Sequence, residues 1–324
     1  MRVTILGANG FIGRKIATQL ARSGLPGGGK PESLILFDLV TPPVPEASFR
    51  VQAISGDLAE LPPQAIPPGT DLVFHLAAVV SAQAEADYEL GRRVNLRGTD
   101  AVIDACRRLA HPPRLVFTSS VATYSGGQNA VLDDDARQIP ANTYGAQKAA
   151  AELIVGDASR RGFLDAVSIR LPTIVVRPGS PNRAASSFVS SIVREPLLDL
   201  EAELPVANDF AIWIASPRRA VDWLLHAAVM DTTPMGLDRG INPPGLSVTV
   251  AHLLQALDQV RPGASSLVRR RPDPAISAIV AHWPAAFDTV RAKTFGFASH
   301  EPLVELVRAF LEDDLEATKR ERGL

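Results

Sequence analysis

Apolar residues in the first half of the chain form short runs that alternate with longer amphipathic segments. The runs that predict buried strands lie at residues 3–6, 34–37, 49–55, 71–75, 115–119 and 166–170. Helical periodicity separates several of these strands, at residues 12–23, 95–110 and 143–161. Short buried strands that alternate with helices are typical of a parallel sheet covered on both faces. The pattern therefore predicts an α/β fold built on a doubly wound parallel sheet.

The second half of the chain has a different sequence pattern. It is rich in proline and shows no simple alternation of strands and helices. Helical patterns occur at residues 187–194, 222–230, 250–260 and 302–314, with Pro196 expected to end the first of them. The charged tail at 319–322 is expected to fray. These segments predict a smaller, mostly helical lid over the carboxyl edge of the sheet, where ligands bind in such folds. We therefore predict a sheet domain at residues 1–172 and a lid at 173–324, from which some segments return to the first domain.

A glycine-rich turn joins the first predicted strand to the first predicted helix. Gly7 would permit the tight turn, Gly10 would let backbone N–H groups approach a pyrophosphate, and Gly13 would let the helix pack closely on the strand. The N-terminus of the helix adds partial positive charge. Asp38, at the end of the second strand, could accept hydrogen bonds from both hydroxyls of an adenosine ribose and would repel a 2′-phosphate. The segment therefore predicts a Rossmann-type site for NAD rather than NADP. Its candidate residues are Gly7, Asn9, Gly10, Phe11, Ile12, Gly13 and Asp38.

Composition limits the other functions open to the chain. Its 324 residues carry a formal net charge of −2, which leaves no electrostatic footprint for nucleic acid. The run Arg269, Arg270 and Arg271 is expected on a loop, where three charges are most simply a solvated face. The single cysteine, Cys106, excludes an internal disulfide and is expected to be a small buried residue. The longest apolar run, at 72–80, is too short to span a bilayer, and no signal peptide is visible, so we expect a cytoplasmic protein without a membrane partner.

A second chemical signal lies at the start of the helix predicted at 143–161. Tyr144 and Lys148 are four residues apart, so their side chains share one helix face. A nearby lysine ammonium would lower the pKa of a tyrosine, which is otherwise a poor base at neutral pH. Ser119 and Ser120 follow the strand at 115–119 and could orient a substrate oxygen whose proton Tyr144 removes. The pattern predicts a catalytic Ser–Tyr–Lys site beside the cofactor.

These motifs resemble the extended short-chain dehydrogenases/reductases of the NAD-dependent epimerase/dehydratase superfamily, over nearly the whole chain. The residues that carry the resemblance are Gly7, Gly10, Gly13, Asp38, Gly56, Asp57, Leu58, His75, Leu76, Ala77, Ala78, Val94, Asn95, Gly98, Thr99, Ser119, Ser120, Tyr144 and Lys148. The resemblance implies that Asp57 and Leu58 meet the adenine and that Leu76, Ala77 and Ala78 line the cofactor cleft. It also implies that Asn95 supports the site and that Pro172 and Thr173 border the nicotinamide. We expect His75 to be structural.

Three activities are compatible with these motifs: oxidation of a small hydroxy acid, epimerisation or dehydration of a nucleotide sugar by retained NAD, and sensing of NAD without catalysis. The third is weakened by the intact Ser120, Tyr144 and Lys148. Val121 and Ala122 stand where dehydratases of the family carry an acidic residue. The strand at 166–170 continues into Leu171, Pro172 and Thr173 without the aromatic–asparagine pair of the epimerases. These departures favour the first activity, with nucleotide-sugar epimerisation as the alternative.

Segments of the second half resemble the D-erythronate dehydrogenases, which oxidise the C2 hydroxyl of a four-carbon sugar acid with NAD. They include residues 171–181, 185–188, 194–197 and 213–218. The expected reaction is D-erythronate to 2-dehydro-D-erythronate. Loop residues Ser81, Asn182 and Arg183 are candidate substrate contacts, and Arg177 and Arg194 are alternative partners for the carboxylate. The alanine-rich helices at 95–110 and 143–161 predict a homodimer that pairs them across a two-fold axis.

Overall fold

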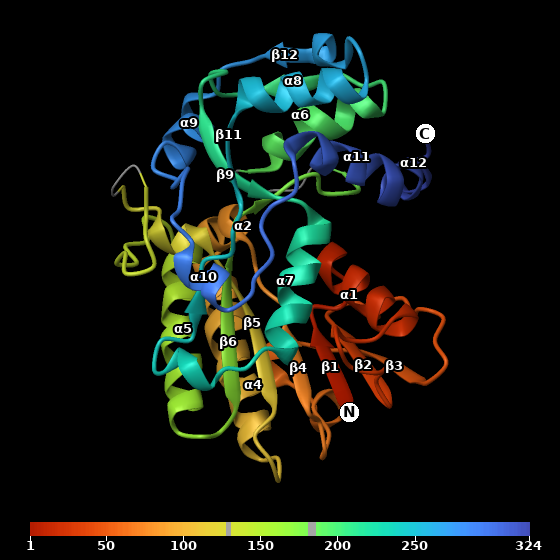
Figure 1. Cartoon of the computed structure of the whole chain (residues 1–324), viewed down its shortest axis with the longest axis vertical. Coiled ribbons are helices and arrows are strands. Elements are labelled where there is room, and N and C mark those ends of the chain that lie inside the picture. The colour runs from red at the N-terminus through yellow and green to blue at the C-terminus, as the bar shows by residue number, and fades with distance from the viewer. Residues whose placement is uncertain (128–130, 181–185) are drawn as a thin grey trace. The chain divides into compact units, whose positions relative to one another are not determined.

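The computed structural model describes residues 1–127, 131–180 and 186–324. The chain folds into two compact units, shown in Figure 1. The first unit comprises residues 1–123, 142–170 and 221–242, and the second comprises residues 124–141, 171–220 and 243–324. The second unit thus begins its long segment near residue 171, and the chain re-enters the first unit at residue 221.

A seven-stranded sheet is the centre of the first unit. Its strands, in order across the sheet, are β3 (Arg50–Ser55), β2 (Ser33–Asp38), β1 (Arg2–Leu6), β4 (Leu72–His75), β5 (Arg114–Ser120), β6 (Asp165–Leu171) and β10 (Gly240–Ile241). The sheet is parallel, as the registers of β1 with β2 and β4 show. This order is that of the doubly wound Rossmann fold, with a seventh strand added at one edge. The prediction of fold class and of six of these strands is confirmed. β10 was not predicted, because two residues give no readable pattern.

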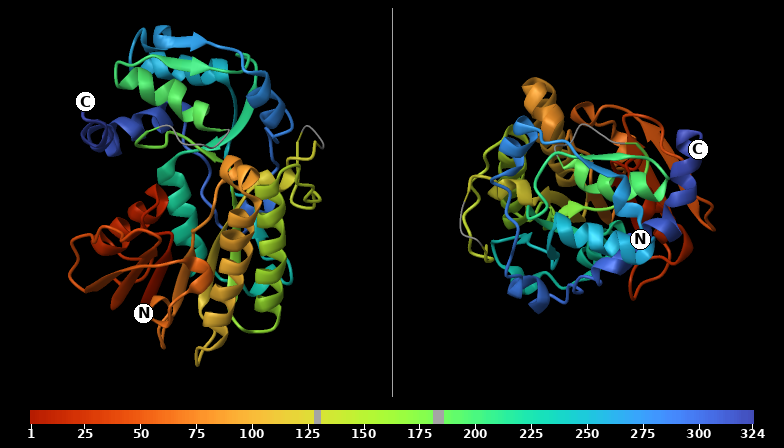
Figure 2. Two further views of the ribbon diagram at one scale, coloured as in Figure 1. Left: turned by 180° about the vertical axis from the view of Figure 1, so that it is seen from behind. Right: turned by 90° about the horizontal axis from the view of Figure 1, so that it is seen from above.

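Helices cover both faces of this sheet. α1 (Phe11–Arg22) and α7 (Pro217–Val229) lie over one face, and α4 (Gly98–Arg107) and α5 (Thr143–Arg160) lie side by side over the other, as Figures 1 and 2 show. The helix predicted at 95–110 is more complex than expected, because α3 (Tyr88–Arg92) and a π-helical turn (Arg93–Arg97) run into α4 without a break. A short helix α2 (Ser81–Ala86) precedes them.

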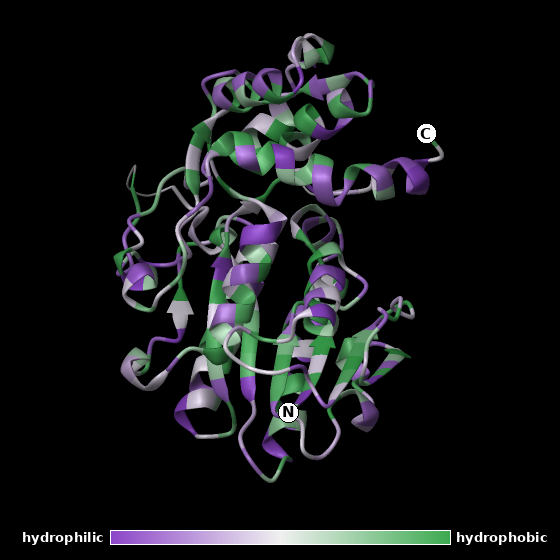
Figure 3. Ribbon diagram, turned by 45° about the vertical axis from the view of Figure 1, so that its right-hand side comes forward, coloured by the Kyte–Doolittle hydropathy of each residue, from purple (hydrophilic) through white to green (hydrophobic). Residues whose placement is uncertain are grey.

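The core of the first unit is apolar, as the green strands in Figure 3 illustrate. Leu6, Phe37, Val73 and Phe117, from four neighbouring strands, are at most 1 % exposed and pack with Val155 of α5. β-branched and aromatic side chains suit such buried strands. Cys106 of α4 belongs to the same core, where burial raises the pKa of its thiol to about 12, so it is an inert packing residue.

The second unit holds two small sheets and most of the C-terminal helices. Its strands are β7 (Thr173–Ile174), β9 (Ala211–Ala215) and β11 (Leu246–Thr249) in one sheet, and β8 (Ala202–Leu204) and β12 (Val268–Arg270) in the other. Its helices are α6 (Ser187–Leu197), α8 (Val250–Val260), α9 (Pro274–Val280), α10 (Val290–Thr294), α11 (Leu303–Asp313) and α12 (Leu315–Arg322). Val193, Ile214, Leu253 and Phe310 are buried in a core of their own.

Three local predictions for the second unit were wrong. Pro196 lies inside α6, which continues to Leu197, because a proline in the last turn removes only one helical hydrogen bond. The tail at 319–322 does not fray: it is the end of α12, and Arg322 forms an ion pair with Glu195. Arg269 and Arg270 lie on β12 and not in a loop, although their side chains are exposed as expected, and Arg269 pairs with Glu201 at 2.8 Å.

Within the described part of the chain, no helix combines the length and the apolar character needed to cross a membrane.

Candidate active site and cofactor cavity

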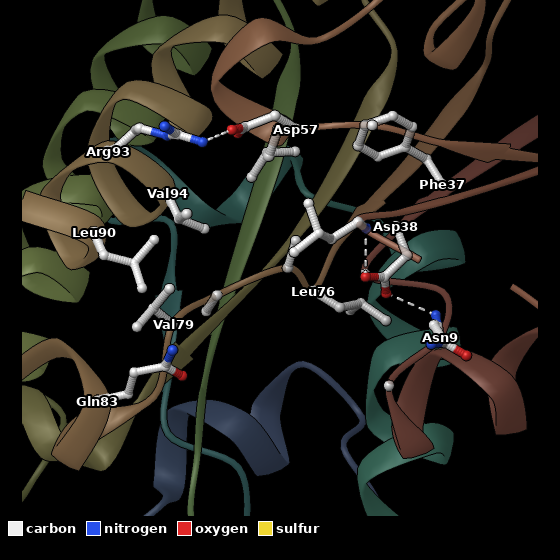
Figure 4. A pocket seen from close by; sticks show the side chains of 17 residues that line it. Asn9, Phe37, Asp38, Asp57, Leu76, Val79, Gln83, Leu90, Arg93 and Val94 are labelled. Atoms are coloured by element: carbon white, nitrogen blue, oxygen red, sulfur yellow. Dashed lines mark hydrogen bonds and ion pairs between the residues drawn. The ribbon is translucent and has the colours of Figure 1, made fainter. Parts of the chain in front are cut away.

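A cavity of about 500 Å³ opens at the carboxyl ends of β1 to β4. The strand order reverses between β1 and β4, and this switch point is where doubly wound sheets bind ligands. Figure 4 shows the cavity from close by. Its lining comprises Gly7, Asn9, Gly10, Phe37, Asp38, Leu39, Gly56, Asp57, Leu58, Leu76, Ala77, Ala78, Val79, Gln83, Leu90, Arg93 and Val94. Nine of the predicted cofactor residues therefore lie around one cavity, namely Gly7, Asn9, Gly10, Asp38, Asp57, Leu58, Leu76, Ala77 and Ala78.

The three glycines of the first turn are required for different reasons. Gly7 has a φ of +89°, and a Cβ there would lie 2.6 Å from the backbone nitrogen of Ala77. A Cβ at Gly13 would lie 2.4 Å from the Gly7 carbonyl oxygen, so Gly13 permits close packing. At Gly10 the nearest protein atom would be 3.4 Å away, which is ordinary contact. The protein itself tolerates a side chain at Gly10, so the need for glycine there comes from the cavity.

The N-terminus of α1 meets this cavity at Gly10. Among the described residues, no side chain caps the helix at that end. The first-turn amides of Phe11, Ile12 and Gly13 have no carbonyl partner within the helix, and they carry the positive end of the helix dipole. Uncapped amides beside a glycine that leaves room for a ligand fit the diphosphate of a dinucleotide.

Asp38 is held in place by two backbone amides. Its Oδ2 accepts from the Asn9 amide at 2.8 Å, and its Oδ1 accepts from the Leu39 amide at 2.7 Å. Each carboxylate oxygen keeps a further lone pair for another donor. The side chain is thus fixed at the wall of the cavity, as Figure 4 shows, with capacity left for two hydroxyl donors. These residues fit the adenosine ribose of NAD.

Asp57 and Leu58 line the opposite part of the cavity. Asp57 Oδ1 caps a short 3₁₀ turn by accepting from the Ala59 amide at 2.9 Å, and Oδ2 forms an ion pair with Arg93, visible in Figure 4. Leu58 is buried, and a Cβ at Gly98 would lie 2.6 Å from its Cδ2, which explains the glycine at the start of α4. Arg93 was not predicted as a site residue, although it stands directly before the Val94–Asn95 motif.

Asn95 is 2 % exposed and ties two parts of the site together. Its Oδ1 accepts from the Val79 amide at 2.9 Å, and its Nδ2 donates to the Val79 carbonyl at 3.0 Å and to Gln147 Oε1 at 2.7 Å. Val79 lines the cavity, and Gln147 precedes Lys148 on α5. Asn95 does not line the cavity itself, and Gln147 was not predicted. The signal for Gln147 was its position inside the Tyr144–Lys148 motif.

Tyr144 and Lys148 occupy the first turns of α5. The start of this helix is fixed by Asn142, whose Oδ1 accepts from the Gly145 amide at 2.8 Å, and by Glu85, which accepts from the Thr143 amide at 2.8 Å. Lys148 is 2 % exposed, and its Nζ donates to the Thr118 carbonyl at 2.7 Å. The same Nζ lies 5.9 Å from the centre of the Tyr144 ring. The two side chains therefore share one face of α5.

Burial governs the charge of Lys148. Loss of water lowers the pKa of its ammonium from 10.5 to about 7, and the negative charge of Glu152 opposes this shift. His75 has no solvent exposure, and burial with a contribution from the Lys148 charge lowers its pKa to about 3. His75 is thus neutral, and its Nε2 lies 2.9 Å from Thr99 Oγ1. This arrangement agrees with the structural role expected for His75.

The two serines at the end of β5 have different surroundings. Ser119 is 2 % exposed, and its hydroxyl donates to the Glu152 carboxylate. Ser120 is half-buried, and its Oγ accepts from the Ala122 amide at 3.1 Å, which leaves the hydroxyl proton available for donation. Ser120 is therefore the serine whose surroundings suit a substrate oxygen.

The remaining predicted residues lie elsewhere. Ser81 begins α2, between the cavity residues Val79 and Gln83. Pro172 and Thr173 belong to the second unit, and Asn182 and Arg183 lie outside the described residues.

The two alternative arginines are both engaged within the second unit. Arg194 is 1 % exposed, donates to the Arg177 carbonyl at 2.8 Å and pairs with Glu195 at 2.7 Å, so it is not available to a substrate, contrary to expectation. The guanidinium of Arg177 donates to the Ile174 carbonyl at 3.2 Å and to Ser186 at 3.1 Å.

Comparison with known proteins agrees with this geometry. Residues 3–210 match the NAD dependent epimerase/dehydratase family. The chain is 45% identical over 320 residues to D-erythronate dehydrogenase of Cupriavidus necator, covering 97% of this chain and 98% of that protein. It is 39% identical to D-erythronate dehydrogenase of Haemophilus influenzae, covering 97% and 100%. A crystal structure described as a nucleoside-diphosphate-sugar epimerase from Agrobacterium tumefaciens superposes with a TM-score of 0.91 at 40% identity, covering 98% of this chain and 95% of that one.

A Rossmann-type sheet, a dinucleotide cavity at its switch point and a Tyr–Lys pair on one helix face define an NAD-dependent oxidoreductase that acts on a CH–OH group. The chain belongs to the NAD dependent epimerase/dehydratase family. Its cofactor is NAD, and its substrate is a small molecule.

Proposed function

We propose that this protein oxidises the C2 hydroxyl of a small sugar acid, with D-erythronate converted to 2-dehydro-D-erythronate. The observation that carries the proposal is full-length identity, at 45% and 39%, to two D-erythronate dehydrogenases. The site residues support it, because Tyr144, Lys148 and Ser120 provide a base, a cation and a hydroxyl donor without an additional acid at Val121 or Ala122. The proton transfer of an oxidation needs no additional acid.

Tyr144 is the general base of the proposed reaction. The Lys148 ammonium lies within 5.9 Å of the tyrosine ring and stabilises the phenolate form. Ser120 donates its hydroxyl proton to the substrate oxygen and holds it in reach of Tyr144. The C2 hydroxyl gives its proton to Tyr144 as the C2–H bond breaks and the C–O bond becomes a carbonyl. When bound, NAD⁺ would supply the acceptor for the hydride that C2 loses.

The cavity residues hold the cofactor in this proposal. The amides of Phe11, Ile12 and Gly13 at the start of α1 bind the diphosphate, and Asp38 binds the adenosine ribose. The remaining assignments follow the family: Asp57 and Leu58 to the adenine, Leu76, Ala77 and Ala78 to the cleft wall, Lys148 to the nicotinamide ribose, and Pro172 and Thr173 to the nicotinamide.

A short acid also needs donors for its carboxylate. Arg183, Asn182 and Ser81 remain the candidates, since Arg194 is buried in an ion pair with Glu195. An arginine would bind the carboxylate through charge-assisted hydrogen bonds and so set which hydroxyl faces Tyr144. We assign this recognition to the part of the sequence that follows Leu171, where Asn182 and Arg183 stand.

The alternative function is epimerisation of a nucleotide sugar with retained NAD. It is favoured by one observation, the description of the Agrobacterium tumefaciens structure as a nucleoside-diphosphate-sugar epimerase at 40% identity. The two activities differ in a measurable way. A dehydrogenase must exchange NAD⁺ for NADH in each cycle, whereas an epimerase returns the hydride within one active site.

We also propose that the protein is a homodimer paired through α4 and α5. Leu153 of α5 is 73% exposed, and a Cβ at Gly156, one turn away, would meet no atom within 4 Å. A large apolar side chain on an open alanine-rich helix face suits a helix–helix interface. Leu153→Lys should convert the dimer to monomer in analytical ultracentrifugation. A wild-type protein that sediments as a monomer would contradict the proposal.

The test of function is a screen for NADH formation. Purified protein is mixed with NAD⁺ and each of several four- to six-carbon sugar acids, with the neutral tetritol erythritol as the matched control. We expect stoichiometric NADH with D-erythronate and far less with erythritol. Equal rates on the acid and on erythritol would remove the sugar-acid proposal. Interconversion of a UDP- or dTDP-sugar without net NADH would establish the alternative.

A further inference from the structure

A carboxylate lies buried one helical turn beyond Lys148. Glu152 is 8 % exposed. Among the described residues of the first unit, no other aspartate or glutamate is buried. Residues four apart on a helix share one face, so Glu152 extends the row formed by Tyr144 and Lys148. Glu152 was not predicted as a site residue, and the proposed reaction gives it no direct part.

Side chains from two neighbouring strands, β5 and β6, hold this carboxylate. One oxygen accepts from the Ser119 hydroxyl at the end of β5. The other accepts from Arg170 of β6, with Nε and Nη2 each at 2.9 Å. Gly240 of β10 makes room for Arg170, because a Cβ there would lie 2.2 Å from its Nη2. An arginine that places two N–H groups on one carboxylate oxygen fixes the position of that carboxylate.

We propose that Glu152 is a positioning residue for the reaction: Ser119 and Arg170 hold its carboxylate beyond Lys148, and its negative charge keeps the Lys148 ammonium protonated. This inference rests on the proposed role of Lys148 beside Tyr144. Arg170 and Ser119 act through Glu152, and Glu152 acts through Lys148. No member of the three needs to touch the substrate.

The surroundings of Lys148 show why a counter-charge is needed. The groups facing its ammonium are the Thr118 carbonyl at 2.7 Å and the Phe117 ring at 4.6 Å, both from β5. The titratable groups are His75 from β4, which is neutral, and Tyr144 and Glu152 from α5. Glu152 is the negative group whose charge raises the pKa of Lys148, and both residues are buried, so the medium between them has a low dielectric constant and their charges interact strongly.

The pKa of the Lys148 ammonium lies close to neutral pH. Burial lowers the pKa of the ammonium to about 7 even though Glu152 raises it. Without Glu152 the lysine would lose its proton below neutral pH. A neutral lysine cannot stabilise the Tyr144 phenolate, so the pH range in which the base is active would narrow from its alkaline side.

The inference can be tested without any substrate, by following Lys148 itself. The chain has lysines at positions 15, 30, 148, 293 and 319, few enough for NMR of protein labelled with ¹³C-lysine. The Lys148 signal is identified by its loss in Lys148→Arg. In Glu152→Gln we expect its titration midpoint to fall by about one pH unit or more. An unchanged midpoint in the folded variant would overturn the inference.

Two further variants keep the test decisive if Glu152→Gln does not fold. Glu152→Gln leaves Arg170 buried without its partner and could prevent folding, so the double variant Glu152→Gln, Arg170→Gln removes both charges together. The double variant removes the negative charge that raises the pKa of Lys148, so the midpoint should fall in the double variant as well. Glu152→Asp keeps the charge and should restore a midpoint near that of the wild type. Either folded Gln variant with a wild-type midpoint contradicts the proposal.

A matched control is available on the same helix. Asp157 pairs with Arg160 at 2.6 Å, but both side chains are more than half exposed. Asp157→Asn should leave the Lys148 midpoint unchanged, and a shift as large as that of Glu152→Gln would show that any acid on α5 has the effect, against the inference. If the midpoint falls in Glu152→Gln but no sugar acid is oxidised, the proposed function fails and the role of Glu152 stands. If a sugar acid is oxidised but the Lys148 midpoint is unchanged in Glu152→Gln, the proposed function stands and the role of Glu152 fails.

Discussion

The side-chain amide of Asn95 donates a hydrogen bond of 2.7 Å to Gln147, across 52 positions of the sequence. The same asparagine holds both backbone groups of Val79 in the cavity wall. One buried carboxamide thus connects the wall of the cofactor cavity to the helix that carries Tyr144 and Lys148. The cofactor and the base keep a fixed relation because this link is rigid and buried.

Asn95→Ala should disturb both parts of the site. It leaves the buried groups of Val79 and Gln147 without their partner, which costs about 1–3 kcal/mol for each unsatisfied group. We expect a lower free energy of unfolding in urea, weaker NAD⁺ binding and slower turnover together. Gln52→Ala, which removes an exposed carboxamide bonded to Arg50 at 3.3 Å, is the control and should change none of them. Normal NAD⁺ affinity in Asn95→Ala would contradict the proposed link.

Gly10 and Gly13 should respond differently to alanine. At Gly10 the new Cβ meets only a carbonyl at 3.4 Å, so the free energy of unfolding should change by no more than about 1 kcal/mol, while NAD⁺ binding is lost. At Gly13 the Cβ meets a backbone oxygen at 2.4 Å, and the variant should be destabilised by about 1–3 kcal/mol or more. Calorimetric titration with NAD⁺ and urea unfolding separate the two effects. Strong NAD⁺ binding by Gly10→Ala would show that the diphosphate lies elsewhere.

Asp38 should set the choice of cofactor. Its two oxygens are oriented by Asn9 and Leu39 and are placed to bind a ribose diol. Asp38→Ala removes charge-assisted hydrogen bonds of about 1.5–3 kcal/mol each, so the Kd for NAD⁺ should rise at least about tenfold. Binding of NADP⁺ should improve relative to NAD⁺, because the repulsion of its 2′-phosphate disappears. Asp104→Ala, at an exposed position on α4, is the control. Wild-type discrimination in Asp38→Ala would exclude Asp38 as the ribose ligand.

The parts of the site that are local in sequence could be predicted from it. β1, the glycine turn, α1 and Asp38 follow one another within one βαβ unit, so their spacing alone fixes their arrangement. Tyr144 and Lys148 are likewise related by a single helical turn. In both cases the geometry depends on backbone periodicity and not on distant contacts.

The partners that Arg93, Gln147 and Glu152 find could not be predicted, because each lies on another element. Arg93 meets Asp57 across 36 positions, and Glu152 meets Ser119 across 33. From the sequence alone, a polar residue on a helix is predicted to face solvent, because the elements that pack against it are not known. Arg194 shows the reverse case: the sequence allowed it as a partner for the substrate carboxylate, but in the structure it pairs with Glu195 and donates to the Arg177 carbonyl.

Tyr144→Phe tests the base directly. The change removes the one hydroxyl proposed to accept the substrate proton and leaves Lys148 bonded to the Thr118 carbonyl. Turnover of the sugar acid that the wild type oxidises should fall by about 10²–10⁴-fold, while the Kd for NAD⁺ stays near that of the wild type. Tyr88→Phe, at an exposed tyrosine on α3, is the control and should keep full turnover. Unchanged turnover in Tyr144→Phe would exclude Tyr144 as the base.

His75 should make the fold sensitive to acid. Burial lowers its pKa in the native state to about 3, whereas the ordinary value is 6.5. Between these values the unfolded chain binds a proton that the native chain does not, so stability present above pH 6.5 is lost as the pH falls toward 3. One such group contributes a slope of up to about 1.4 kcal/mol per pH unit. His75→Gln keeps a donor for Thr99 but has no titrating group there. Its urea midpoint should therefore fall less steeply than that of the wild type between about pH 6 and about pH 4. His111→Gln, at an exposed histidine, should follow the wild type. Equal slopes for wild type and His75→Gln would mean that His75 gains its proton without unfolding the chain.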